Sequence, residues 1–345
     1  MSDKIKVAFF DAKDYDIASF NEANKDGKIK IKYFETKLDE DTVKLAKGYD
    51  AVCVFVNDTV DAKVINALRK RDVKLIALRC AGFNNVDVAA AGGIATKDKT
   101  SKDTAAKDKI GVVRVPAYSP YAVAEHAMSL LLTSTRRIHK AYIRTKDFNF
   151  SLNGLMGFDL HGKTVGVVGT GKIGRVFINI CKGFGMKVIA YDKFPAKDAD
   201  FEYVSLKEIW KHSDIISFHC PLTEETYHMV DAKSIKSMKK GVVLINTSRG
   251  ALIDADALLE GIRNRHVGAA CLDVYEEEAD VFFEDRSGHI FEDDTLARLI
   301  SMPNVIVTSH QAFLTKEALT NIAHTTLSNI SEYLETGKCA NEVNM

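Results

Sequence analysis

The segment Val165-Gly-Val-Val-Gly-Thr-Gly-Lys-Ile-Gly174 decides the fold of this chain. Its first four residues predict a buried strand, and its three later glycines have the spacing G-x-G-x-x-G. The pattern then predicts a helix over Arg175–Phe184 and a second strand over Lys187–Tyr191, which Asp192 closes. This order of strand, glycine turn, helix, strand and acid is typical of a unit that binds a dinucleotide. For the glycine motif taken alone, an ordinary turn is the alternative.

Each part of this unit has a physical task. The first glycine permits a tight turn, the second lets the backbone approach the pyrophosphate, and the third allows close helix packing. The helix N-terminus offers free N–H groups to the phosphates. The final acid would bond a ribose diol and repel a 2′-phosphate, which favours NAD over NADP. The predicted cofactor contacts here are Gly169, Gly171, Lys172, Ile173, Gly174 and Asp192.

Length and composition predict an ordinary globular protein of two domains. The chain has 345 residues, of which 46% are hydrophobic and 27% are charged. Basic and acidic residues number 47 each, so no bulk charge indicates a nucleic acid or a membrane as partner. The six cysteines are scattered without a C-x-x-C pair, which indicates neither disulfides nor zinc. With no cleavable apolar leader and no long apolar run, we expect a cytoplasmic protein.

Strands and helices alternate on both sides of the glycine motif, which predicts an α/β fold of two doubly wound parallel sheets, the second in a Rossmann NAD-binding domain. In the first half the expected strands are Ile5–Phe10, Ile29–Phe34, Ala51–Val56, Leu75–Leu78 and Val112–Val115. In the second half, further strands are expected at Ile215–Phe218, Val242–Ile245, Val267–Leu272 and Val305–Val307. Thr315 should cap a last helix, to about Leu334, that can return to the first domain.

Three segments between these elements leave alternatives open. The turn Arg79–Asp87 either brings N–H groups near a small anion, through Gly82, or is a strand-to-helix turn capped by Asn85 or Asp87. The lysine- and aspartate-rich stretch Thr96–Lys109 is either an exposed loop or a basic docking patch, and its mixed charges favour the exposed loop. Ser119-Pro120 opens a helix predicted over Tyr121–Lys140, whose apolar stripe is either core or a subunit contact.

Ligands of open α/β sheets bind outside the carboxyl ends of the strands. Four polar segments of the second half follow a strand directly, so an arginine, several acids and a histidine should converge there. They are His219-Cys-Pro-Leu222, Asn246-Thr-Ser-Arg-Gly250, Asp273-Val-Tyr-Glu-Glu-Glu278 and Ser309-His310.

This set of side chains suits the reduction of a ketone. The carbonyl oxygen gains negative charge, and histidine is the natural proton donor near neutral pH. A neighbouring carboxylate favours the protonated imidazolium, and a guanidinium can hold a substrate carboxylate with two parallel hydrogen bonds. Arg249 could instead be a surface or capping residue, and His310 could simply bond a loop backbone. The acidic run Glu276–Glu278 could be solvated, and the sequence does not choose which acid reaches the histidine.

The chain resembles the D-isomer-specific 2-hydroxyacid dehydrogenases, and within them the fermentative D-lactate dehydrogenases. The matching segments run nearly from end to end. They are Arg79–Asp87, Val113–Pro120, Ala122–His126, Val168–Gly174, His219–Thr223, Asn246–Gly250, Leu272–Glu276 and Ser309–Phe313. The stretch Thr96–Lys109 departs from the family pattern as an insertion of about a dozen residues.

The resemblance implies roles for particular residues. Arg249 would bind the substrate carboxylate, His310 would be the general acid and base, and Glu278 would be its carboxylate partner. The backbone of Ala81 and Gly82 would also meet the carboxylate, and Tyr118 would line the pocket. Asp273 would take the nicotinamide amide. Other residues expected to flank the cofactor are Cys220, Pro221, Thr247, Ser248 and His310.

The resemblance further implies a flavodoxin-like substrate/catalytic domain of residues 1–117 and 314–345 and a Rossmann NAD-binding domain of residues 118–313. It also implies a homodimer or homotetramer with contacts from Tyr121–Lys140. It implies NADH-dependent reduction of pyruvate to D-lactate. A sister enzyme for a bulkier 2-keto acid is the nearest alternative, and an NAD(H)-sensing binding protein of the corepressor kind is another. A zinc alcohol dehydrogenase is disfavoured because no histidine has metal-ligand spacing, and we expect no metal.

Overall fold

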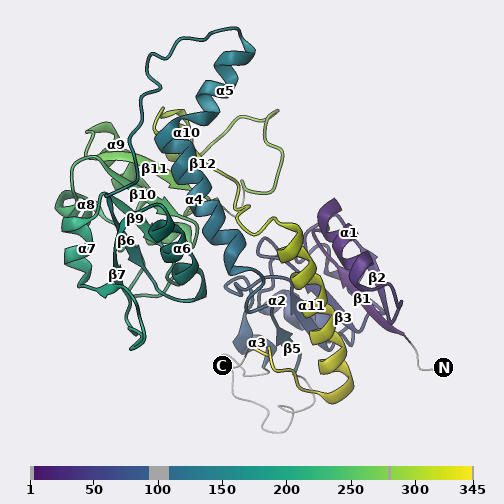
Figure 1. Cartoon of the computed structure of the whole chain (residues 1–345). Coiled ribbons are helices and arrows are strands. Elements are labelled where there is room, and N and C mark those ends of the chain that lie inside the picture. The colour runs from purple at the N-terminus through teal and green to yellow at the C-terminus, as the bar shows by residue number, and fades with distance from the viewer. Residues whose placement is uncertain (1–3, 93–108, 279–280, 344–345) are drawn as a thin grey trace. The chain divides into compact units, whose positions relative to one another are not determined.

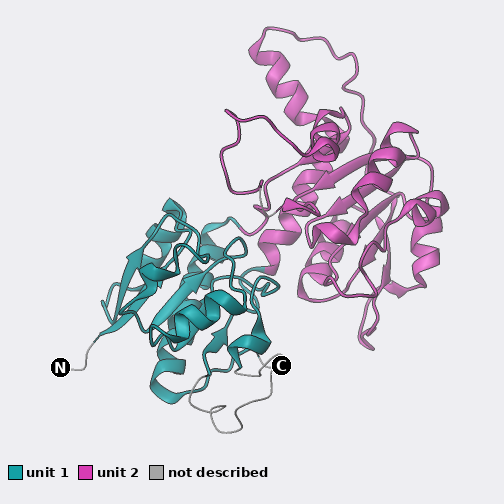
Figure 2. Cartoon of the chain, turned by 180° about the vertical axis from the view of Figure 1, so that it is seen from behind, with its two compact units in different colours: residues 1–119, 314–345 teal, residues 120–313 magenta. Residues whose placement is uncertain are grey.

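A computed structural model describes residues 4–92, 109–278 and 281–343. The chain forms two compact units, Met1–Ser119 with Leu314–Met345 and Pro120–Phe313 (Figure 2). The first boundary between the units therefore follows Ser119, whereas the resemblance implied a domain boundary after residue 117. Of the predicted insertion Thr96–Lys109, only Lys109 lies within the described residues.

The first unit contains a five-stranded parallel sheet with the order β2-β1-β3-β4-β5 (Figure 1). This is the flavodoxin-like order, as predicted. The strands are short and mostly buried, because helices cover the sheet. They are β1 (Ile5–Phe9), β2 (Ile29–Tyr33), β3 (Ala51–Val54), β4 (Leu75–Leu78) and β5 (Gly111–Val113).

The last helix of the chain returns to this first sheet. Thr315 caps α11 (Lys316–Thr336) by accepting a hydrogen bond from the Ala318 N–H, and α11 packs against α1 (Asp14–Ala23), β4 and β5. Elsewhere in the unit, α2 (Ala62–Arg69) packs with α3 (Val88–Ala91) and the short 3₁₀ helix η1 (Val43–Ala46).

The residues that follow α11 lie along the edge of β5. Glu342 forms an antiparallel bridge with Val113, and the Val343 N–H donates to the Val112 carbonyl at 2.8 Å. The Lys109 ammonium pairs with the Glu342 carboxylate at 2.7 Å. The end of the chain thereby covers an edge whose backbone groups would otherwise be unpaired. No pattern in the sequence indicated this pairing.

The second unit contains a seven-stranded parallel sheet with the order β12-β11-β10-β9-β6-β7-β8. Numbered from the strand of the glycine motif, this is the Rossmann order with one added strand at one end. The strands are β6 (Thr164–Val168), β7 (Lys187–Tyr191), β8 (Glu202–Tyr203), β9 (Ile215–Phe218), β10 (Val242–Asn246), β11 (Val267–Leu272) and β12 (Val305–Val307).

Helices cover both faces of this sheet. In β10, Val243 and Ile245 face a core shared with α4 (Pro120–Arg136) and α6 (Lys172–Gly183), whereas Val242 and Leu244 face the opposite core. The helices of that second core are α7 (Leu206–His212), α8 (Ala232–Ser237), α9 (Ala255–Arg263) and α10 (Asp294–Ser301). Burial on both faces explains why the strand sequences are almost continuously apolar.

The prediction of one continuous helix over Tyr121–Lys140 is wrong. The helix ends after Arg136, because Arg137 adopts a left-handed backbone with φ of 52°, and α5 (Ile138–Lys146) begins next to it. The apolar stripe of α4 is core, since Ala127, Leu130 and Leu131 are buried, whereas α5 has no buried residue. No described helix is long and apolar enough to cross a membrane.

Candidate active site

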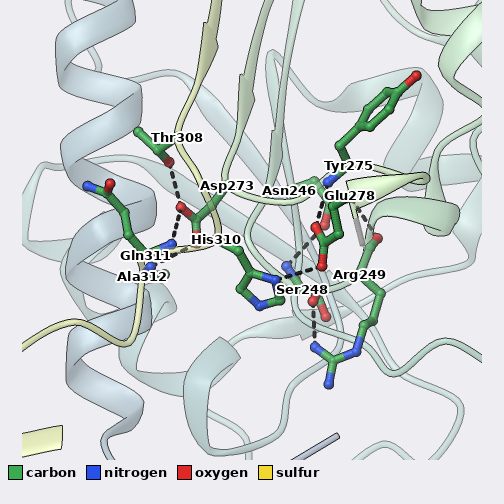
Figure 3. A network of polar contacts seen from close by, with 10 residues as sticks. All are labelled: Asn246, Ser248, Arg249, Asp273, Tyr275, Glu278, Thr308, His310, Gln311 and Ala312. Atoms are coloured by element: carbon green, nitrogen blue, oxygen red, sulfur yellow. Dashed lines mark hydrogen bonds and ion pairs between the residues drawn. The ribbon is translucent and has the colours of Figure 1, made fainter. Parts of the chain in front are cut away.

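The four polar segments predicted to converge follow four neighbouring strands, β9 to β12. The last residues of these strands pair directly, Phe218 with Asn246, Asn246 with Leu272 and Leu272 with Val307. The turns after these strands therefore lie at one edge of the sheet. Figure 3 shows their side chains.

His310 and Glu278 form a hydrogen-bonded pair. The Nδ1 atom of His310 lies 2.7 Å from the Oε1 atom of Glu278, and both side chains are 20% exposed. The other carboxylate oxygen of Glu278, Oε2, accepts a hydrogen bond from the Tyr275 N–H at 2.9 Å (Figure 3). The backbone therefore orients the Glu278 carboxylate, and the carboxylate orients the His310 ring. The ring also lies 5.9 Å from the ring of Phe283. This arrangement leaves Nε2 as the nitrogen available for proton transfer.

Two acids of the run Glu276–Glu278 bind different histidines. Of its three acids, Glu278 reaches His310, and Glu276 accepts a hydrogen bond from a different histidine, His228, at 2.5 Å from Nε2 to Oε1. The structure thus makes the choice that the sequence left open, and the solvated alternative does not hold for these two acids.

Asp273 holds the loop that carries His310. Its carboxylate is fully buried and accepts hydrogen bonds from the Thr308 hydroxyl and from the N–H groups of Gln311 and Ala312. Burial alone would raise the pKa of Asp273, but hydrogen bonds, first from His126 and then from Thr308, hold that pKa below its usual value. The His310 N–H also donates to the Asp273 carbonyl at 2.7 Å. The predicted contact of Asp273 with nicotinamide stays a prediction.

His126, the last residue of the matching segment Ala122–His126, was given no site role from the sequence. It lies on α4, and its Nε2 atom is 3.2 Å from Oδ1 of Asp273 and 3.1 Å from the Thr308 hydroxyl. It therefore belongs to the network behind His310. The motif Ala122–His126 was the only sequence signal for this, since its partners are far along the chain.

Arg249 lies in a tight turn between β10 and the short η2 helix (Gly250–Leu252). The side-chain amide of Asn246 donates to the Arg249 carbonyl at 2.9 Å. A Cβ atom on Gly250 would lie 2.0 Å from the Tyr275 carbonyl, so glycine is required for this turn to meet the turn of Glu278. The guanidinium donates to the Ser248 carbonyl at 2.7 Å, and no carboxylate in the described part of the chain pairs with it. The guanidinium is therefore available to bind an anionic ligand.

The glycine loop has the shape that a dinucleotide needs. Gly169 has φ of 95°, and a Cβ there would meet the backbone of His219 and Cys220 at 2.6 Å. A Cβ on Gly174 would lie 2.0 Å from the Gly169 carbonyl, whereas one on Gly171 would meet nothing within 4 Å. Gly169 therefore serves the turn, Gly174 serves the packing, and Gly171 leaves open space. The predicted contact of Gly171 with a pyrophosphate stays a prediction. Lys172 and Ile173 begin α6, one residue after its N-cap at Gly171.

Asp192 stands at the end of β7, beside this loop. Its Oδ2 atom accepts hydrogen bonds from the N–H and hydroxyl of Thr170, at 2.7 and 2.9 Å. Burial opposes ionisation, but these bonds and the Phe194 N–H hold the pKa of Asp192 below its usual value. An ionised acid at this position fits a ribose diol and disfavours a 2′-phosphate.

The other predicted cofactor contacts lie on two adjoining turns. The Ser248 hydroxyl donates to the Cys220 carbonyl at 2.6 Å, which joins the turn after β10 to the turn after β9. Burial raises the pKa of the Cys220 thiol to about 11, so the thiol is neutral. Pro221 follows with its carbonyl bonded to Thr226, and Thr247 is buried. Their contacts with a cofactor stay predictions. No group of metal-ligating side chains occurs among the described residues.

Comparison with known proteins identifies the family of this chain. The NAD binding domain model of the D-isomer specific 2-hydroxyacid dehydrogenases matches residues 128–312, and the catalytic domain model matches residues 7–94. The chain belongs to this family. The D-lactate dehydrogenase of Escherichia coli is 48% identical over 98% of this chain and 100% of its own length.

Solved structures agree with this membership. The pyruvate reductase of Chlamydomonas reinhardtii superposes with a TM-score of 0.88 at 42% identity, covering 96% of this chain and 97% of the other. A D-2-hydroxyisocaproate dehydrogenase superposes with a TM-score of 0.83 at 33% identity, covering 98% and 99%. As a member of the family, the chain is an NAD-dependent oxidoreductase.

The predicted substrate residues of this dehydrogenase that precede α4 lie in the first unit. Ala81 and Gly82 form a half-buried turn after β4, and Asp87 caps α3 by accepting the Ala90 N–H at 2.9 Å. The capping alternative for the turn Arg79–Asp87 is therefore correct for Asp87. The other alternative, that N–H groups at Gly82 bind a small anion, stays a prediction. Tyr118 is half-buried, and its carbonyl accepts a hydrogen bond from Asn321.

A partly buried histidine gives the dehydrogenase a predicted sensitivity to acid. Burial lowers the pKa of His219 from 6.5 to about 3, and its Nε2 atom lies 2.9 Å from the Ser217 hydroxyl. Because the unfolded chain takes up a proton below pH 6.5 and the folded ring does not, stability is lost as the pH falls from 6.5 toward 3. Between pH 7 and pH 5 we expect a loss of about 2 kcal/mol from this group.

His219→Gln should remove that loss. Trp210, the only tryptophan, is buried on α7 and reports the unfolding of the second unit by fluorescence in urea. The control is His212→Gln, at an exposed position, which should keep the pH dependence of the unmodified protein. An equal pH dependence of the unfolding free energy in His219→Gln and in the unmodified protein would contradict the assignment.

Proposed function

We propose that this protein catalyses the reversible NAD-dependent reduction of pyruvate to D-lactate. The observation that carries the proposal is the pair of His310 and Glu278, 2.7 Å apart, at the sheet edge that also carries Arg249. A proton donor and a free guanidinium at the carboxyl edge of a Rossmann sheet suit a ketone that bears a carboxylate. The relatives named D-lactate dehydrogenase and pyruvate reductase support this substrate.

The proposed reaction consumes pyruvate, NADH and one proton, and yields lactate and NAD⁺. NADH, when bound, supplies the two electrons and the hydrogen that reach the carbonyl carbon. The imidazolium of His310 donates its Nε2 proton to the carbonyl oxygen, and Glu278 stabilises the charged ring before transfer. Arg249 binds the carboxylate with two hydrogen bonds, which orients the ketone. In the reverse direction the neutral His310 accepts the hydroxyl proton.

The cofactor would be held by residues whose geometry fits it. The open approach at Gly171 and the first turn of α6 would face the pyrophosphate, and Asp192 would bond the ribose. Cys220, Pro221, Thr247 and Ser248 would flank the rest of the cofactor, since their turns adjoin at the same edge. The D configuration of the product follows from family membership.

A bulkier 2-keto acid is the second candidate substrate, because the similar structures include a D-2-hydroxyisocaproate dehydrogenase. The test is NADH oxidation with pyruvate, 2-ketoisocaproate and phenylpyruvate, followed by chiral analysis of the product. Fastest turnover of pyruvate to D-lactate supports the proposal. A preference for a larger acid would keep the chemistry and replace the substrate. Bound NADH with no turnover of any acid would favour a sensing protein.

We infer a homodimer, because a run of apolar side chains is open to solvent. In and after α5, seven large apolar residues are more than half exposed, which is unusual for a lone chain. They are Ile138, Tyr142, Ile143, Phe148, Phe150, Leu152 and Met156. A second copy of the chain would bury them.

The expected result is a dimer in sedimentation equilibrium, and the double variant Phe150→Asp with Leu152→Asp should be monomeric. A monomer before any substitution would contradict the inference. We also infer a reducing, cytoplasmic location, which is supported by six buried cysteines, none of which forms a disulfide.

A further inference from the structure

The turn that follows β4 has three consecutive carbonyl groups that are all hydrogen-bonded. The Cys80 carbonyl accepts the Val115 N–H at 3.1 Å, and the Gly82 carbonyl accepts the Cys80 thiol at 3.3 Å. Between them, the Ala81 carbonyl accepts Nη1 of Arg114 at 2.8 Å. A turn in which every acceptor is engaged has a fixed orientation at each peptide.

These bonds also fix the direction of two N–H groups. The Ala81 carbonyl and the Gly82 N–H belong to one trans peptide, so they point in opposite directions, and the same holds for Cys80 and Ala81. Arg114 and Val115 hold the two carbonyls, so the N–H groups of Ala81 and Gly82 are aimed away from them. Neither N–H donates a hydrogen bond within the described residues. Two unused donors in a half-buried turn suit a small anion.

The far end of the turn is held as firmly as the near end. The side-chain amide of Asn85 donates to the carbonyls of Phe55 and Asp58, each at 2.8 Å. The N–H of Val60 in turn donates to the Asn85 carbonyl at 3.1 Å. The turn cannot rotate as a whole without breaking these bonds, so the Ala81–Gly82 peptide could reorient only by losing its own bond to Arg114.

Arg114 is itself fixed by the backbone around it. Its carbonyl accepts the side-chain amide of the buried Asn329 at 2.9 Å, and its N–H donates to the Asn341 carbonyl at 3.1 Å. The guanidinium lies 5.1 Å from the centre of the Phe83 ring. A cation bonded to a carbonyl polarises that peptide, which strengthens the N–H at its other end as a donor.

We propose that Arg114 is a positioning residue for substrate binding, which orients the Ala81–Gly82 peptide so that its N–H can bind the carboxylate of the 2-keto acid. The proposal rests on the proposed function. Arg114 does not touch the substrate in this scheme. It acts through the Ala81 carbonyl, so its loss should weaken the binding of the acid and spare both proton transfer and the cofactor.

Arg114→Met keeps the length of the side chain and removes both the hydrogen bond and the charge. We expect the KM for pyruvate to rise about tenfold, the size of effect that loss of one charge-assisted hydrogen bond produces. The value of kcat should change by less than about threefold, and the Kd for NADH, measured by fluorescence, should not change. Arg114→Lys restores one donor and the charge, so its KM should rise only about threefold.

Arg71→Met is the matched control, since Arg71 lies in the same unit and also donates through Nη1 to a backbone carbonyl, that of Ala67, at 2.7 Å. It should leave KM unchanged. A folded Arg114→Met with a KM within twofold of the unmodified protein overturns the proposal, as does a loss confined to kcat or to NADH binding. If that variant does not fold, an unchanged KM in Arg114→Lys overturns it. An unmodified protein that reduces no 2-keto acid would reject the proposed function itself.

Discussion

His310→Gln is expected to lower kcat for pyruvate reduction about a thousandfold while the Kd for NADH stays within twofold. General acid catalysis contributes roughly 10²–10⁴ to a rate, and glutamine cannot donate a proton at neutral pH. The amide of glutamine can still hydrogen-bond Glu278, which holds the imidazole at 2.7 Å, so the neighbouring turn should keep its shape. The measurement is steady-state kinetics at saturating NADH, with cofactor binding followed by fluorescence.

His324→Gln is the control for this experiment. His324 lies on the solvent side of α11, where the same substitution removes an imidazole without touching the sheet edge. It should keep the activity of the unmodified protein. A kcat for His310→Gln that falls by less than tenfold would remove His310 from the role of general acid.

Arg249→Lys should lower kcat/KM for pyruvate about a hundredfold. Hydrogen bonds to charged groups contribute about 1.5–3 kcal/mol each, and lysine cannot form the two parallel bonds of a guanidinium. Most of the loss should be in KM, because the carboxylate is bound both before and during the chemical step. The Arg249 carbonyl remains bonded to the Asn246 side chain in the variant, so the turn itself should persist.

Arg263→Lys provides the comparison for that result, because Arg263 is an exposed residue of α9 whose partner is Glu260 one helical turn away. We expect no change in either kinetic constant. An equal loss of NADH affinity and pyruvate affinity in Arg249→Lys would mean that Arg249 supports the cofactor, and the assignment as carboxylate clamp would be wrong.

The sequence predicted the two sheets because their signals are local and periodic. Continuous apolar strands, separated by helices and by the glycines at 169, 171 and 174, allow few arrangements other than a doubly wound sheet. The same rule placed Arg249 and His310 at one edge of the sheet, since polar residues directly after neighbouring parallel strands must share an edge. Geometry of this kind is encoded by position along the chain.

Other features depend on contacts that no local pattern encodes. The break at Arg137 needs a left-handed backbone, yet neither glycine nor proline marks it. The choice of Glu278 over Glu276 depends on the Tyr275 N–H that fixes the carboxylate. Arg114 was passed over as part of a matching segment, because its partner Ala81 belongs to a different strand end. Such pairings are set by the folded sheet.

The last residues of the chain have a practical consequence for anyone who prepares this protein. Asn341, Glu342 and Val343 lie along β5, and Asn341 also holds the backbone of Arg114. Proteolysis after α11 during purification would therefore remove backbone partners of β5. A trimmed sample should titrate normally with NADH while giving a raised KM for pyruvate. An intact-mass spectrum of each batch would distinguish such a sample from a genuine variant effect.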